Sequence, residues 1–149
     1  MEQSFFRVLV SLLLFNEQNR LLLVRNQNTE TSHNNYGVVS AYLLEDETVF
    51  STLLRSVEEN LGITIKERDL SVVLSMQLKK EGQNDFVVFV QSNRWKGEFS
   101  TINEKVYDDY MWVNPDLLPL NTEDHLRRAI HCYKKGIYFT VYQPSQETS

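Results

Sequence analysis

Residues 48–61 constrain the fold more than any other segment, because they predict one sharply delimited amphipathic helix. Thr48 can cap the start of this helix, and Gly62 stands where a C′ glycine would end it. Apolar residues recur at four-residue intervals and form one stripe: Val49, Leu53, Val57 and Leu61. The remaining positions are mostly polar, so we expect the helix to bury one face against a sheet and to expose the other.

The rest of the chain predicts strands and one further helix. We expect strands at residues 5–15, 21–25, 36–44, 63–79, 85–92, 107–113 and 137–142. The first two are joined by the polar residues 16–20 and suggest a hairpin, while residues 27–35 suggest a mobile loop. A second helix is predicted from about Thr122 to Lys135, with Asn121 as its N-cap and Gly136 at its end. These elements predict an α/β sandwich with a mixed sheet.

Composition favours one domain over residues 1–143, with a disordered tail at 144–149. The net charge of −5 argues against a partner that is a nucleic-acid polymer or an anionic membrane. The apolar run at residues 8–15 is too short to span a membrane and lacks the flanks of a signal peptide. Cys132 is the only cysteine, which fits a reducing compartment, so we expect a cytoplasmic protein.

Residues 41–63 resemble the Nudix box, Gly-x5-Glu-x7-Arg-Glu-U-x-Glu-Glu-x-Gly-U, in which U is a bulky aliphatic residue. The sequence keeps six of these positions at the right spacing, namely Glu47, Arg55, Val57, Glu59, Gly62 and Ile63. It departs at three, where Ala41, Ser56 and Asn60 replace a glycine and two glutamates. Further matches outside the box, such as Met111-Trp112-Val113, extend the resemblance over about residues 6–140. The chain therefore resembles small bacterial MutT-like Nudix proteins, and this resemblance implies a Nudix α/β/α sandwich.

The resemblance also implies a chemistry and a set of residues for it. Family members use Mg²⁺ or Mn²⁺ to act on a diphosphate, and carboxylates on one face of the helix supply the hard oxygen ligands. The box match makes Glu59 the remaining metal ligand of the helix and assigns Ala41 a backbone carbonyl ligand. Glu45 and Glu104 are candidate additional ligands. Since one carboxylate remains of three, we expect a divalent metal to bind poorly or not at all.

Glu47 and Arg55 match the pair that holds the box loop in shape, and together with Glu59 they form the candidate catalytic set. Arg25 precedes the segment that resembles the substrate loop, and Tyr36 and Tyr42 could stack on a nucleobase. We therefore name these three as candidate substrate-binding residues. The alternative for the tyrosines is an ordinary place in the core or on the surface of a sheet.

Two functions remain open from the sequence. One is a pyrophosphohydrolase for nucleoside diphosphates linked to another group, with a depleted metal site and weak or altered activity. The other is a catalytically silent Nudix domain that binds a nucleotide or a protein partner. A nucleotide-type small molecule is the expected ligand, and a homodimer is compatible with either function. Helical spacing places Ser56 and Asn60 on the polar side of the helix, where substitution by glutamate should be tolerated.

Overall fold

The computed structural model describes residues 1–26, 34–99 and 102–144. Its strands, in chain order, are β1 (Arg7–Leu14), β2 (Leu21–Asn26), β3 (Tyr36–Gly37), β4 (Ser40–Tyr42), β5 (Ser71–Lys80), β6 (Gln83–Ser92), β7 (Tyr107–Val113) and β8 (Phe139–Tyr142). The two α-helices are α1 (Val49–Leu61) and α2 (Asp124–Lys135), and a short 3-10 turn covers Glu67–Asp69. In the part of the chain that is described, no helix is long and apolar enough to cross a membrane.

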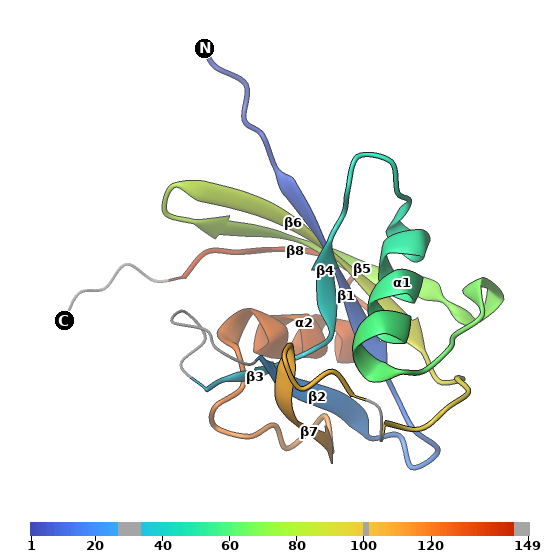
Figure 1. Ribbon diagram of the computed structural model, residues 1–149. Coiled ribbons are helices and arrows are strands. Elements are labelled where there is room, and N and C mark those ends of the chain that lie inside the picture. The colour runs from blue at the N-terminus through green and yellow to red at the C-terminus, as the bar shows by residue number, and fades with distance from the viewer. Residues whose placement is uncertain (27–33, 100–101, 145–149) are drawn as a thin grey trace.

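The strands form a five-stranded mixed sheet in the order β4-β1-β6-β5-β8 and a three-stranded antiparallel sheet in the order β3-β2-β7. In the larger sheet, β1 pairs in parallel with β6 and β5 pairs in parallel with β8 (Figure 1). Neighbouring residues of β1 point to opposite sides: Leu13 joins the core cluster of α2, and Leu14 joins that of α1. The sheet thus lies between the two helices, which confirms the expected α/β/α sandwich.

The hairpin expected between the first two strands is wrong. Residues 16–20 do form a tight turn, in which the Asn16 N–H donates to the Arg20 carbonyl at 3.0 Å. Beyond the single bridge between Phe15 and Leu21, however, β1 and β2 separate into different sheets. Both strands are apolar on their two faces because each contributes alternately to both core clusters. A strand buried on both faces lacks the alternation from which a sheet partner could be inferred.

Three other boundaries differ from expectation. The segment 36–44 divides into β3 and β4, which belong to different sheets, and the strand expected from residue 63 begins at Ser71. Helix α2 begins at Asp124, because the Glu123 N–H is held by the Tyr36 carbonyl at 2.9 Å. Asn121 is not its cap and instead donates its side-chain amide to the Asn34 carbonyl at 3.0 Å. Most of the expected loop at 27–35, and all but the first residue of the expected tail, lie outside the described residues.

Candidate functional site

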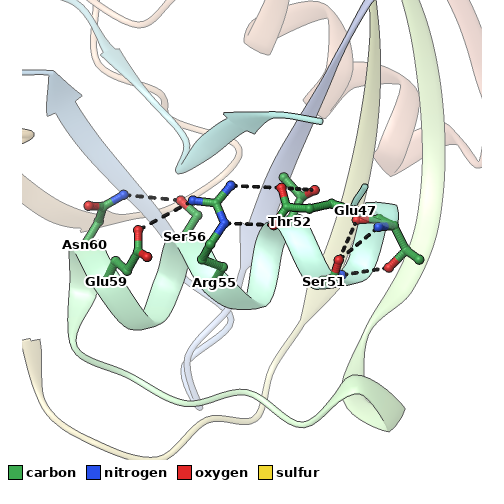
Figure 2. Close-up of polar contacts among 8 residues, drawn as sticks. Glu47, Ser51, Thr52, Arg55, Ser56, Glu59 and Asn60 are labelled. Carbon is green, nitrogen blue, oxygen red and sulfur yellow. Dashed lines mark hydrogen bonds and ion pairs between the residues drawn. The ribbon is translucent and has the colours of Figure 1, made fainter. Parts of the chain in front are cut away.

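Helix α1 carries the central residues of the Nudix box, and Glu47 lies in the loop just before it (Figure 2). The ends of the helix form as the sequence predicts. The Ser51 N–H donates to the Thr48 hydroxyl at 3.0 Å, and the Thr48 N–H donates to the Ser51 hydroxyl at 2.9 Å. This reciprocal capping box satisfies two of the free N–H groups at the helix start. At the other end Gly62 takes the left-handed conformation, with a φ of 73° that suits glycine. The polar face of the helix is therefore fixed at both ends.

Glu47 and Arg55 form the expected brace between the box loop and the helix. Arg55 donates Nε–H to Glu47 Oε2 at 2.8 Å and Nη2–H to Oε1 at 3.0 Å, a two-point contact of the kind that fixes orientation. Thr52, fully buried, adds a hydroxyl hydrogen bond to Glu47 Oε1 at 3.1 Å. The Arg55 guanidinium is the main reason that the pKa of Glu47 lies below its usual range, and the Thr52 hydrogen bond adds to this effect while desolvation opposes it.

Ser56 and Asn60 occupy the box positions where the family carries glutamates, and they contact each other. The Asn60 side-chain amide donates to the Ser56 hydroxyl at 3.3 Å. Ser56 is only 1% exposed, whereas Asn60 is half-buried. The expectation that both lie on an open polar side is thus wrong for Ser56, since this small side chain packs under the helix beside the sheet. Two carboxylates are replaced here by a neutral hydrogen-bonded pair.

The other candidate metal ligands on side chains are exposed or paired, although the Asn103 N–H, next to Glu104, donates to the Asn60 carbonyl at 2.8 Å. The Glu59 side chain is 60% exposed and lies 3.5 Å from Arg55 Nη1 (Figure 2), while Glu45 and Glu104 are exposed. Within residues 1–26, 34–99 and 102–144, no three His, Cys, Asp or Glu side chains are placed to hold a metal ion. Mg²⁺ in proteins is usually held by one or two carboxylates together with water and substrate phosphates. Glu59 is the one box carboxylate on α1, and it is paired with Arg55. Together with the neutral Ser56 and Asn60 groups, it does not fit the metal that the family resemblance implies.

The three candidate substrate-binding residues have different surroundings. Arg25 donates Nε–H to Asp108 at 2.7 Å, and the buried Tyr36 donates its hydroxyl to Asp109, so both polar groups already have partners on β7. Tyr42 is 40% exposed and lies under the Arg7 guanidinium, 4.3 Å from ring centroid to Cζ. Of the three, only Tyr42 lines the main cavity described next.

A cavity of about 450 Å³ opens beside β4. Its walls come from β1, β4, the ends of β5 and β6, and the start of α2, and they include Ser40, Ala41, Tyr42, Lys80, Asp85, Glu123, His125 and Tyr142. Asp85 is buried and neutralised by Arg7, which donates Nε–H at 3.0 Å. Ala41 lines this cavity and also occupies the first position of the box, so the cavity adjoins the box. The cavity has the size of small-molecule sites in proteins, roughly 300–1,000 Å³.

Glu123 is a half-buried acid of this cavity. A Cβ added at Gly37 would lie 2.9 Å from its carboxylate, so the glycine leaves the space that the carboxylate fills. Burial raises the pKa of Glu123, and burial together with the Lys80 charge lowers the pKa of His125 to about 4. His125 is therefore neutral at pH 7, and its Nε2, 3.4 Å from Glu123 Oε2, does not neutralise the acid. Sequence reasoning missed both residues, because the first turn of α2 carries no pattern that reveals a cavity.

Comparison with protein families decides the assignment. The model of the NUDIX domain matches residues 5–133, which is most of the chain. The chain belongs to the Nudix family. Family membership confirms the resemblance drawn from the box and from the matches beyond it.

Solved structures show the same fold. A crystal structure of a MutT Nudix hydrolase from Burkholderia pseudomallei has a TM-score of 0.76 at 18% identity, over 86% of this chain and 98% of that one. The MutT protein of Methanosarcina mazei Go1 has a TM-score of 0.74 at 16% identity, over 91% and 97% of the two chains. No curated protein matches the sequence. At these identities the structures establish the fold and leave the chemistry to the residues of the site.

Proposed function

We propose that this Nudix domain binds a nucleotide-type small molecule and hydrolyses pyrophosphate bonds weakly or not at all. The observation that carries the proposal is the neutral Ser56–Asn60 pair on the helix face that matches the box. For Mg²⁺ or Mn²⁺ chemistry at a diphosphate, protein carboxylates hold the ion against the substrate phosphates. Arg55 pairs with both Glu47 and Glu59, the two box carboxylates that remain, and so offsets their charge. Among the described residues, no three His, Cys, Asp or Glu side chains are placed to hold an ion.

The cavity beside β4 supports the ligand-binding half of the proposal. Tyr42 and Tyr142 offer aromatic surface for a planar ring, Glu123 accepts hydrogen bonds, and Lys80 supplies a positive charge for a phosphate. A cavity that combines apolar walls with a few polar groups is the usual form of a small-molecule site. The cavity meets the box at Ala41, so a ligand bound there would lie next to the first box position.

The intact brace favours a second candidate, a hydrolase with an altered metal site. Glu47 and Arg55 keep their two-point contact, and the loop before α1 is held as a working box would require. Glu45 and Glu104 would then have to move to join Glu59 around an ion. For either function we propose a cytoplasmic location, because the single cysteine, Cys132, is a buried free thiol.

Calorimetry separates the two candidates. Nucleoside diphosphates and nucleotide sugars are titrated into the protein with EDTA and then with Mg²⁺. Formation of the nucleoside monophosphate is measured in parallel by chromatography. The proposal predicts binding in EDTA and little gain in binding or turnover with Mg²⁺. Tyr42→Ala should weaken binding, and Leu120→Ala, which removes a fully exposed side chain that does not line the cavity, serves as its control. Metal-dependent turnover by the wild type would favour the hydrolase, and the absence of any binding would overturn the proposal.

A further inference from the structure

The last strand, β8, forms an unprotected edge of the five-stranded sheet. Within the described residues, β8 pairs only with β5 and has no strand on its other side (Figure 1). Residues 137–143 contain no charged side chain and no proline. Four large apolar residues are exposed there: Ile137, Tyr138, Phe139 and Val141, at 41%, 79%, 47% and 48%. Edge strands that stay single usually carry a charge, a proline or a bulge, so this edge is unusual for a surface that faces water.

The hydrogen bonds to β5 determine which groups of β8 are free. Ser75 pairs with Phe139 in parallel register, and the Ser75 N–H donates to the Tyr138 carbonyl at 3.0 Å. In a parallel ladder the bonds then alternate, so Thr140 and Tyr142 also face β5. The N–H and C=O groups of Phe139 and Val141 consequently point outwards from the sheet. These are the groups that an added antiparallel strand would use.

The sequence of β8 is complementary to itself in one register. With a two-fold axis at Thr140, Phe139 of each copy exchanges both backbone hydrogen bonds with the partner's Val141. Side chains that face each other in such a pair lie on the same side of the sheet, so each copy places an aromatic ring against a β-branched side chain. The two threonines meet at the axis on the opposite side. No like charges are brought together.

The charges at the two ends of α2 fit the same arrangement. Helix α2 packs against β5 and β8 and carries Asp124 in its first turn and Lys135 in its last. Lys134, also in the last turn, is already paired with Asp116 at 2.6 Å, and Arg127 and Arg128 lie in the middle of the helix. A two-fold axis perpendicular to the sheet leaves both copies of α2 on one side, running in opposite directions. The first turn of each helix, which is acidic, then lies towards the last turn of its partner, which is basic. The two helix dipoles are antiparallel, which is the favourable arrangement.

We propose that the β8 edge binds a second copy of this chain, joining the two five-stranded sheets into one continuous sheet across a two-fold axis at Thr140. The interface is isologous, as in most homodimers, and its core is the exchanged Phe139–Val141 pair. This inference does not depend on the ligand or on the metal site. A different protein that adds a strand to the same edge is the competing occupant.

Sedimentation and hydrogen exchange test the proposal. The wild type should sediment as a concentration-dependent dimer, and Val141→Lys should sediment as a monomer. Leu120→Lys, which replaces a fully exposed leucine elsewhere, should leave the dimer unchanged. In the dimer the amides of Phe139 and Val141 should be protected as strongly as those of Thr140 and Tyr142. This exchange measurement needs no variant, so it decides the matter even if Val141→Lys fails to fold.

Cross-linking tests the register. Opposite residues of a non-hydrogen-bonded antiparallel pair lie about 4.5 Å apart at Cα, close enough for a disulfide. Thr140→Cys should therefore form a covalent dimer on oxidation, whereas Ser71→Cys, exposed on β5, should not. A monomer at every concentration, a dimer that survives Val141→Lys, or purification with a different protein paired to β8 would each overturn the proposal.

Discussion

Placing carboxylates at the two neutral box positions should give this scaffold a metal site and should lower its free energy of unfolding in the absence of metal. In the double variant Ser56→Glu/Asn60→Glu, the first new carboxylate enters a position that is 1% exposed, and both repel Glu59. Burying an unpaired charge costs several kcal/mol, so we expect the metal-free variant to lose about 3 kcal/mol. For a chain of this size, that loss lowers Tm by roughly 6–12 °C.

Mg²⁺ should then return most of the loss, because it binds the folded state alone. At a concentration a hundred times its Kd, the ion contributes about 2.7 kcal/mol, which raises Tm by roughly 5–11 °C. The assay is thermal melting with and without Mg²⁺, combined with chromatographic detection of the nucleoside monophosphate formed from nucleoside triphosphates and nucleotide sugars. The variant Ser56→Gln/Asn60→Gln has the same bulk without charge and should show no response to Mg²⁺. A folded glutamate variant that also ignores Mg²⁺ would show that this helix face is not where the scaffold holds a metal.

Three further outcomes follow from the described contacts. Arg55→Ala should lower Tm and leave ligand binding nearly intact, since Arg55 contacts Glu47 rather than the cavity; collapse of binding at an unchanged Tm would contradict this. Leu53→Ala, fully buried under α1, should cost about 2–5 kcal/mol in urea unfolding, and a cost near zero would mean that the helix does not pack as described. Because the folded pKa of His125, about 4, lies below its unfolded value near 6.5, its contribution to stability is complete above pH 6.5 and falls as the pH drops towards 4. In His125→Gln, the loss of unfolding free energy between neutral pH and pH 4 should therefore be smaller by up to roughly 3 kcal/mol. The pKa of Glu123 is raised, so this residue favours the folded state at low pH, and its effect should remain in the variant.

The sequence predicted the parts of the fold that are determined locally. Helix α1 has a cap, a stripe and a terminal glycine within 15 residues, and all three form as expected. The strand Tyr107–Val113 was also predicted with its observed bounds. Sheet partners were not predictable, because β1 and β2 are buried on both faces and their sequences do not say which neighbour each takes.

The candidate site was predictable only where a motif exists. The box spacing identified Glu47 and Arg55, and the structure places them in contact. Glu123 and His125 belong to no motif. The backbone bonds between Tyr36 and residues 121–123 and the packing of α2 on β5 and β8 bring them to the cavity. The burial of Ser56 was also missed. The buried face of α1 is wider than its apolar residues indicate, because the small polar residues Thr52 and Ser56 are buried beside them.

The most direct test of the central claim is a calorimetric titration of Mg²⁺ into the wild-type protein at neutral pH. The claim is that a neutral Ser56–Asn60 pair has taken the place of the family's carboxylates, so that the helix no longer holds a divalent ion. We expect no saturable heat in the sub-millimolar range. Saturable binding there would contradict the account and would point to Glu59 acting with Glu45 or Glu104.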